Sequence, residues 1–142
     1  MNPIDRVRSF VDAMLMWEST FHSQKRDAAY KADPVFRQHM NASARVELQA
    51  IYDTHLTKAA GNRLGASRLD ILMTGRPAEY AQRVLAEDTQ SSGGAAYVMA
   101  ETEKGLKTKY RYEVAVEDGQ TKIRDVCTWH SASGKWVPRE GV

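Results

Sequence analysis

A two-stranded hairpin near the C-terminal end of the chain constrains the fold more than any other feature of the sequence. Asp118-Gly119 is a strong hairpin signal, because a two-residue type I′ turn needs positive φ at both central positions. Residues 106–117 alternate between two kinds of side chain, and this period of two predicts a strand with one buried face. The positions expected on the buried face upstream of the turn are Leu106, Thr108, Tyr110, Tyr112, Val114 and Val116. The same alternation downstream of the turn places Ile123, Asp125, Cys127 and Trp129 on that face.

Helical signals fill the part of the chain that precedes the strands. Asn2-Pro3 is a typical helix start, since asparagine caps free backbone N–H groups and proline suits the first helical position. The apolar stripe that follows fades after Phe21. Asp33-Pro34 repeats the signature and predicts a short second helix to about residue 40, after which Asn41 or Ser43 caps a third. The third helix is expected to bury Val46, Leu48, Ile51, Tyr52, His55 and Leu56.

The hydrophobic period changes from helical to strand-like near Ser67, after Gly61 and Gly65 end the helical half. Strands are predicted over residues 67–75, 79–90 and 95–103, followed by the hairpin and a last edge over residues 135–137. A run of helices followed by a run of strands is typical of the α+β class. We therefore expect one domain of residues 1–142, in which three N-terminal helices pack on a curved antiparallel sheet and form a half-open cone.

Charge and composition argue against several classes of function. A net charge of +2 and a pI near 8.7 are too mild for a nucleic-acid-binding protein, in which basic residues gather on one face. The N-terminal residues lack the apolar segment of a secretion signal, and no apolar run approaches the roughly 18 residues of a membrane span. Cys127 is the single cysteine, which fits a reducing compartment. We expect a cytoplasmic protein that binds neither nucleic acid nor membranes.

Asp125 is the first candidate for chemistry, because its place on the apolar face would raise the pKa of its carboxyl by desolvation. Such a group can act as a general base. Tyr52 and His55 lie three residues apart on one face of the third predicted helix, and with Asp125 and Trp129 they could line a polar pocket. Two alternatives stay open. The carboxylate can be hydrogen-bonded in the core or turned outward by a bulge, and the tyrosine and histidine can be ordinary residues at the core margin.

No sequence pattern predicts a metal or a cofactor. The four histidines have no metal-ligand spacing, and neither HExxH nor a paired CxxC is present. The glycines form neither GxGxxG nor a P-loop, so nucleotide binding has no support. Cys127 lacks a partner base and is interpreted as core filler.

Two charged surfaces are candidates for binding another macromolecule. Four acids cluster on two neighbouring predicted strands, close to Tyr97, and such a surface can recognise a basic partner or can simply be solvated. These acids are Glu87, Asp88, Glu101 and Glu103. A basic row on the wet face of the hairpin could bind RNA, but no aromatic residue is expected on that face, so a solvated surface is the alternative. The row consists of Lys107, Lys109 and Arg111, with Lys122 and Arg124 as expected neighbours.

The order of these segments resembles the nuclear transport factor 2-like superfamily. The first helix carries VxxFVDAMLMWE, the second begins with DPVF, the third carries LQAIYDTHLT, and KYRYEVAVEDGQTKIRDV closes the sheet. This closing piece is similar to the terminal hairpin of the superfamily, in which an acidic-Gly turn precedes a strand of the form K-I-x-D-V. Thr121 is a departure, because that position often holds tryptophan in the superfamily. The resemblance covers nearly the whole chain and implies the cone-shaped fold.

Within the superfamily, the chain length, the HLT ending of the third helix and the KYRYEV strand resemble bacterial immunity proteins. The resemblance implies a non-enzymatic protein that occludes a cognate toxin, which is the C-terminal domain of a secreted polymorphic effector. The residues that we expect to bind it are Glu87, Asp88, Tyr97, Glu101, Glu103, Lys109 and Arg111. Isomerases and dehydratases of the same fold suggest the alternative of a small-ligand pocket around Asp125, His55 and Tyr52. A dimer that pairs through its sheet is a third possibility.

Overall fold

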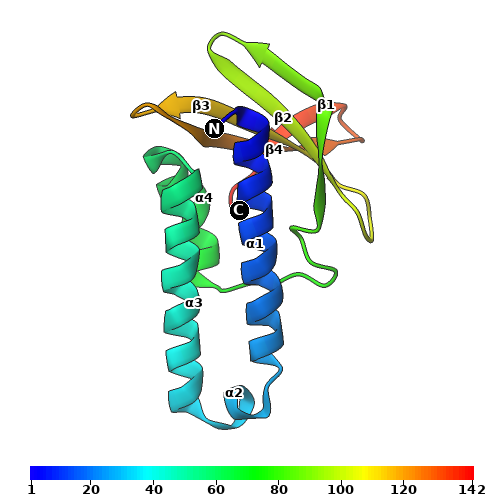
Figure 1. Ribbon diagram of the computed structural model, residues 1–142. Helices are drawn as coiled ribbons and strands as arrows, with labels where there is room; N and C mark the ends of the chain where they lie inside the picture. Colours follow the sequence, from blue (N-terminus) through cyan, green and yellow to red (C-terminus); the bar gives the residue numbers. More distant parts are fainter.

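The computed structural model describes residues 1–142 as four helices followed by a five-stranded antiparallel sheet (Figure 1). The helices are α1 (Pro3–Lys25), α2 (Ala28–Ala32), α3 (Pro34–His55) and α4 (Lys58–Asp70). The strands are β1 (Gln82–Ser92), β2 (Ala95–Thr102), β3 (Lys109–Glu117), β4 (Gln120–His130) and β5 (Lys135–Pro138). Each strand pairs with its neighbour in sequence, in the order β1-β2-β3-β4-β5. The predicted α+β class is confirmed, although the helices number four rather than three.

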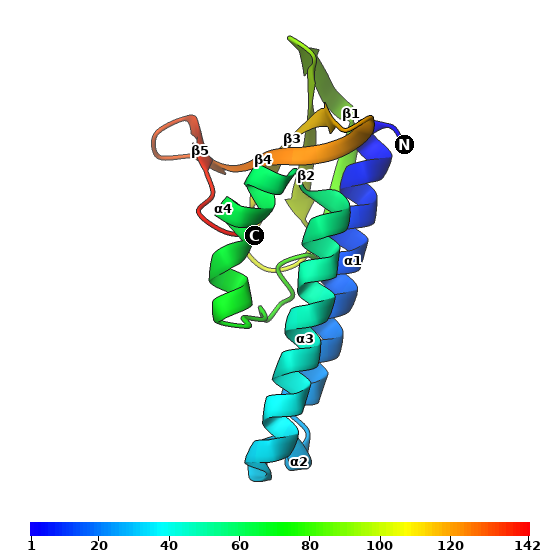
Figure 2. The same ribbon diagram turned by 90° about the vertical axis from the view of Figure 1, so that its left-hand side faces the viewer.

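Helices α1 and α3 run antiparallel and form a long hairpin, and α2 closes its far end (Figures 1 and 2). Both predicted helix starts are confirmed. The Asn2 side chain accepts a hydrogen bond from the backbone of Asp5 at 2.8 Å, and Asp33 accepts one from Val35 at 3.0 Å. The end of the hairpin that carries α2 extends away from the sheet (Figure 2). No helix is both long and apolar enough to span a membrane.

The predicted second and third helices are one continuous helix, α3. Neither Asn41 nor Ser43 acts as a cap, because the side chain of Asn41 accepts a hydrogen bond from the Tyr30 hydroxyl at 2.8 Å and Ser43 is exposed. The segment contains no glycine, and its one proline, Pro34, occupies the first helical turn. Nothing in the segment therefore interrupts the helix.

The predicted strand over residues 67–75 is wrong. Helix α4 continues through Gly61 and Gly65 to Asp70, and residues 71–81 form an irregular loop that leads into β1. Arg68 explains why this segment stays helical and packs inward. Its buried guanidinium donates to the backbone oxygens of Val142 at 3.0 Å and Met73 at 2.8 Å. If the segment were a strand, the Arg68 side chain would lie elsewhere and these hydrogen bonds would be lost.

The loop after α4 is held by Glu18, which is fully buried on α1. Its carboxylate accepts three backbone hydrogen bonds, from Gly75 at 2.7 Å, Glu79 at 3.1 Å and Tyr80 at 3.0 Å. A buried carboxylate is costly unless it is hydrogen-bonded, and these three donors satisfy it. Glu18 therefore fixes the path by which the chain enters the sheet.

The hydrophobic core lies between α1, α3 and the inner face of the sheet. Phe10 on α1 makes edge-on contacts with Tyr80 and Tyr112, whose ring centroids lie 5.8 and 6.2 Å from its own. The alternation predicted for β3 is confirmed at Tyr110, Tyr112 and Val114, all of which are buried. Leu106 and Val116 are exposed, against the prediction, because the first precedes β3 and the second adjoins the turn.

A β-bulge divides β4 into two halves of opposite parity. Glu113 pairs with Asp125, but the next residue of β3, Val114, pairs with Ile123, so Arg124 is the extra residue. Beyond the bulge, Val126 takes the core-facing position. The prediction that Asp125, Cys127 and Trp129 face the core together with Ile123 is therefore wrong, and the alternative of a bulge that turns Asp125 outward is confirmed. All three side chains lie on the outer face, where Cys127 is nevertheless buried.

Candidate functional site

Tyr52 and His55 lie on the buried side of α3, as predicted, but each is bonded within the protein. The Tyr52 hydroxyl donates to the backbone oxygen of Val142 at 2.6 Å. The Arg6 guanidinium donates to Nδ1 of His55 at 2.9 Å. Burial, together with the positive charges of Arg6 and Lys122, lowers the pKa of His55 to about 4. The imidazole is therefore neutral near pH 7 and serves as an acceptor for Arg6.

Asp125 and Trp129 lie on the other side of the sheet from this pair. The carboxylate of Asp125 forms an ion pair with Arg63 at 3.3 Å and accepts a hydrogen bond from the backbone of Val126 at 2.9 Å. Trp129 is 40% exposed. The structure thus does not bring the four residues of the predicted pocket together, because the bulge at Arg124 turns two of them outward.

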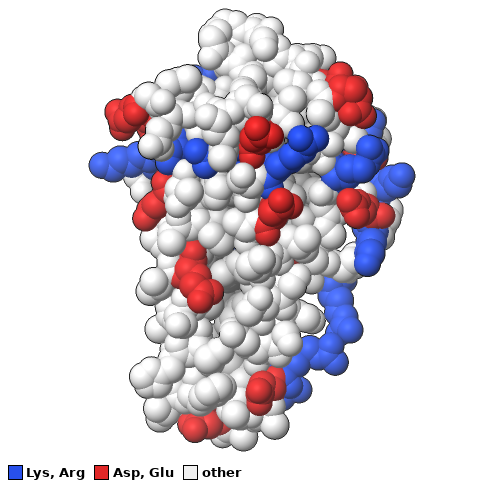
Figure 3. Space-filling view, in the orientation of Figure 1, with Lys and Arg blue, Asp and Glu red and all other residues white.

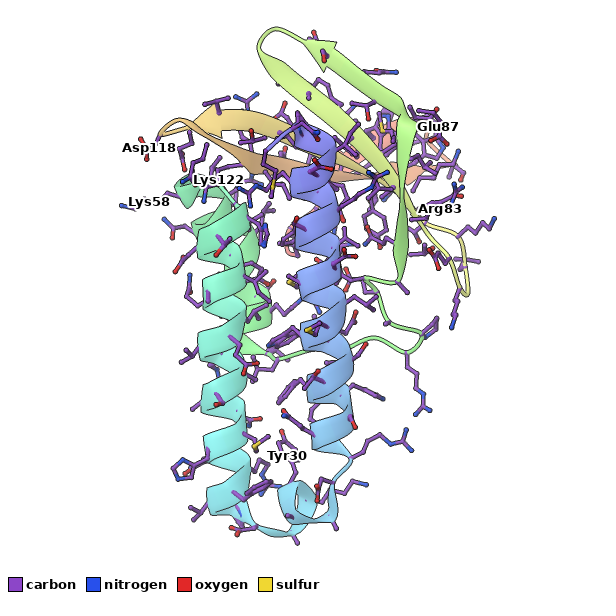
Figure 4. All side chains as sticks on the ribbon, viewed as in Figure 1. Tyr30, Lys58, Arg83, Glu87, Asp118 and Lys122 are labelled. Carbon is purple, nitrogen blue, oxygen red and sulfur yellow. The ribbon has the colours of Figure 1, made fainter.

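A cavity of about 520 Å³ opens where α3, α4 and the β3–β4 turn meet. Figure 4 shows Lys58, Asp118 and Lys122 around it. The Lys122 ammonium donates to the backbone oxygens of residues 53 and 54, at the end of α3. Glu117 accepts a hydrogen bond from the backbone N–H of Lys58, in the first turn of α4, at 2.9 Å. These polar groups therefore satisfy the helix ends and tie the hairpin turn to the helices.

The outer face of the sheet carries a cluster of aromatic and basic side chains. The guanidinium of Arg111 on β3 lies over the ring of Tyr97 on β2 at 5.0 Å and over the ring of Trp136 on β5 at 5.1 Å. Trp129 packs edge-on against Trp136 with ring centroids 5.4 Å apart. Cation–π contacts on both sides hold the plane of the guanidinium in place. We call these four residues, Tyr97, Arg111, Trp129 and Trp136, the outer-face cluster.

The acids beside the outer-face cluster are neutralised within the sheet. Glu101 pairs with Arg83 at 3.1 Å. Glu113 pairs with Arg124 at 2.9 Å and also accepts a hydrogen bond from the Tyr97 hydroxyl at 3.0 Å. The hydrogen bond from Arg124 lowers the pKa of Glu113. These contacts fix the position of Tyr97. They also pair the acids, so the unpaired charges at the centre of this face belong to basic residues.

A groove of about 430 Å³ runs beside the cluster on the outer face. Its wall on β1 is the irregular segment between Leu85 and Gln90, where the pairing with β2 shifts register. Arg83 and Glu87 lie along this strand, far from the β3–β4 turn (Figure 4). The charged residues that line the groove are Glu87, Asp88, Lys109 and Arg111.

The tip of the β1–β2 hairpin differs from the strand edge below it. Figure 3 shows charges of both signs along the edge that contains β1, whereas the hairpin tip carries none. The sequence agrees, because residues 89–100 contain no Lys, Arg, Asp or Glu. The charged side chains of this part of the molecule are therefore confined to the sheet face and to the irregular segment of β1.

The structure places six of the seven predicted partner-binding residues on or beside this face. Glu87, Asp88, Lys109 and Arg111 line the groove, and Tyr97 and Glu101 alternate with the buried residues of β2. Glu103 lies in the turn between β2 and β3. Their role in binding stays a prediction.

Sequence reasoning missed Trp136 and the outward position of Trp129. A signal for the second was present. Arg124 and Asp125 are two consecutive polar residues between the buried Ile123 and Val126, and such a break in alternation indicates a bulge. No comparable signal identified Trp136. It pairs with Trp129, and the bulge decides on which face of the sheet this pair lies.

Comparison with known proteins bears on the resemblance noted in the sequence. A family model described as NTF2 fold immunity protein matches residues 2–140. No curated protein and no solved structure matches the chain. No three His, Cys, Asp or Glu side chains lie close enough together to hold a metal ion. The match to the family model confirms the expected resemblance to immunity proteins of this fold.

Proposed function

We propose that this chain, which belongs to the NTF2 fold immunity protein family, binds a cognate toxin domain in the cytoplasm and neutralises it by occlusion. The family supports the immunity role. The outer-face cluster supports the place of binding, because it exposes aromatic rings and an arginine at the centre of a sheet face. Residues of these types carry most of the binding energy in protein interfaces.

The chemistry of the outer face suits a partner of this kind. A stable interface buries roughly 1,600 Å² in total, with an apolar centre and a polar rim. The rings of Trp129 and Trp136 would supply the centre. Glu87 and Asp88 would supply part of the rim, where unpaired charges steer association with a basic partner.

The alternative of a pocket enzyme has less support from the geometry. An acid/base pair of His55 and Asp125 would need the two side chains in one cavity, but they face opposite sides of the sheet. His55 is bonded to Arg6, and Asp125 is paired with Arg63. We therefore propose binding without catalysis.

The test is co-expression with a toxin domain encoded by a neighbouring gene. Cells that produce the toxin should grow only when this protein is present, and Glu87→Gln combined with Asp88→Asn should weaken the protection. Asp12→Asn combined with Glu47→Gln removes the same charge from exposed positions of the helical hairpin and is the matched control. If the toxin kills equally with and without the wild-type protein, the proposal fails.

A further inference from the structure

We propose that the groove on the outer face receives an acidic side chain of the toxin, whose carboxylate binds Arg111 and Lys109. This inference rests on the proposed function and names the chemistry of the contact. It starts from two basic residues of the face that have no acidic partner. The protein has six ion pairs, and none of them includes Arg111 or Lys109.

The guanidinium of Arg111 donates to no oxygen atom of the protein. Its side-chain hydrogen bond goes to Sγ of Cys127 at 3.9 Å, and sulfur is a weak acceptor. The neighbouring acids Glu101 and Glu113 are already paired, with Arg83 and Arg124 respectively. A guanidinium carries five N–H donors in a planar fork that matches the two oxygens of a carboxylate. The group most complementary to this site is therefore a carboxylate supplied from outside.

The flanking rings prepare Arg111 for this contact. Tyr97 and Trp136 lie on either side of its guanidinium, and Tyr97 is itself held by its hydrogen bond to Glu113. A side chain that is already fixed loses little conformational entropy when it binds. Arg111 is half-buried, and an ion pair that a bound partner removes from water is stronger than one in open solvent. These features distinguish Arg111 from the exposed lysines elsewhere on the surface.

The opposite wall of the groove adds a requirement on the partner. Glu87 and Asp88 belong to no ion pair, and they line the same groove as Arg111. They would repel an acid that approached alone. The toxin segment must therefore present a basic side chain toward β1 and an acidic one toward β3. This order of charges fixes the orientation of the segment in the groove and excludes a uniformly acidic ligand.

The experiment measures the Kd between the purified protein and the toxin domain encoded by the neighbouring gene. Arg111→Gln should weaken binding by about 100-fold, as expected for loss of a desolvated charged contact. Arg111→Lys should recover only part of the affinity, because an ammonium cannot form the planar two-fold contact. Lys31→Gln, at an exposed position of α2, removes the same charge and should leave Kd within about twofold. Thermal melts would verify that the variants are folded.

A charge exchange sharpens the assignment. Arg111→Glu should abolish protection, and a toxin in which one surface acid is changed to arginine should be neutralised by that variant. Such a pair would support the inference and identify the acid. If the wild-type protein binds the toxin and Arg111→Gln binds within about threefold of it, the inference is overturned while the proposed function stands. Absence of binding by the wild-type protein overturns both.

A second copy of the chain is the competing occupant of the groove. Light scattering on the isolated protein separates this case from the proposal. A dimer that Arg111→Gln converts to a monomer would show that the groove pairs with another copy, and the inference would be wrong. A wild-type monomer that binds one toxin domain agrees with it.

Discussion

The guanidinium of Arg6, in the first turns of α1, donates a hydrogen bond to Nδ1 of His55, at the end of α3, over a distance of 2.9 Å. Arg6 also donates to the backbone oxygen of Thr121 at 2.7 Å. The contact joins both long helices to β4, and it requires a neutral imidazole. It therefore makes the stability of the protein depend on pH.

We expect the free energy of unfolding to fall as the pH decreases from about 6.5 to about 4. The folded protein holds the pKa of His55 at about 4, whereas the unfolded chain has the ordinary value near 6.5. Between these values the unfolded chain binds more protons, so acid favours unfolding by up to about 1.4 kcal/mol per pH unit, and the contribution is complete above pH 6.5. His55→Asn keeps an acceptor for Arg6 but does not titrate. Urea unfolding of both proteins at several pH values should show that the wild type loses stability relative to the variant between pH 6.5 and pH 4. A difference between the two proteins that stays constant over this range would contradict the assignment.

The buried carboxylate of Glu18 gives a second prediction. Glu18→Gln replaces one acceptor oxygen with an amide that faces backbone donors, and it should lower the free energy of unfolding by about 2 to 3 kcal/mol. Glu47→Gln makes the same chemical change at an exposed position of α3 and should alter stability by less than about 0.5 kcal/mol. Chemical denaturation measures both. Equal effects would show that the three hydrogen bonds of Glu18 are not important to the fold.

Two glycines of α4 should respond in opposite directions to the same substitution. A Cβ at Gly65 would lie 2.7 and 2.8 Å from two ring carbons of Tyr52, and that ring is buried and bonded through its hydroxyl to Val142. Gly65→Ala should therefore cost about 1 to 3 kcal/mol of stability. A Cβ at Gly61 meets no atom within 4 Å, so Gly61→Ala should stabilise the helix by up to about 1 kcal/mol. Melting temperatures that move in the same direction would refute this packing.

The two tryptophans of the outer-face cluster should contribute unequally to toxin binding. Trp136 lines the groove and contacts Arg111, whereas Trp129 touches the cluster through Trp136. Trp136→Ala should weaken binding by at least about tenfold more than Trp129→Ala, because it removes both the wall of the groove and one support of the guanidinium. Titration calorimetry with the toxin domain compares the two. A larger loss at Trp129 would place the centre of the interface nearer the end of β4.

Sequence reasoning succeeded where the local signal and the tertiary structure agree. The caps at Asn2 and Asp33 are decided by neighbouring atoms, and the alternation from Tyr110 to Val114 is decided by burial on one side. It failed at residues 67–75, whose apparent period of two is overridden by a distant contact, the hydrogen bond from Arg68 to the backbone oxygen of Val142.

The candidate site was harder to predict than the fold. The acids and basic residues of the outer face were recognisable from strand parity, because β2 and β3 are regular there. The assembly of Tyr97, Arg111 and Trp136 was not, since it brings together three strands whose relative register depends on the turns and on the bulge. The role of Glu18 was equally hidden, because its partners lie about 60 residues away.

The bulge at Arg124 has a consequence for how such a protein can change over evolutionary time. Core residues and outer-face residues alternate along β2 and β3, and the bulge resets this alternation once in β4. Substitutions at Tyr97, Arg111 or Trp129 therefore alter the outer face without altering the inward-facing side chains. If this face binds the toxin as proposed, a lineage can change its toxin specificity at one set of positions while selection for folding acts on the other.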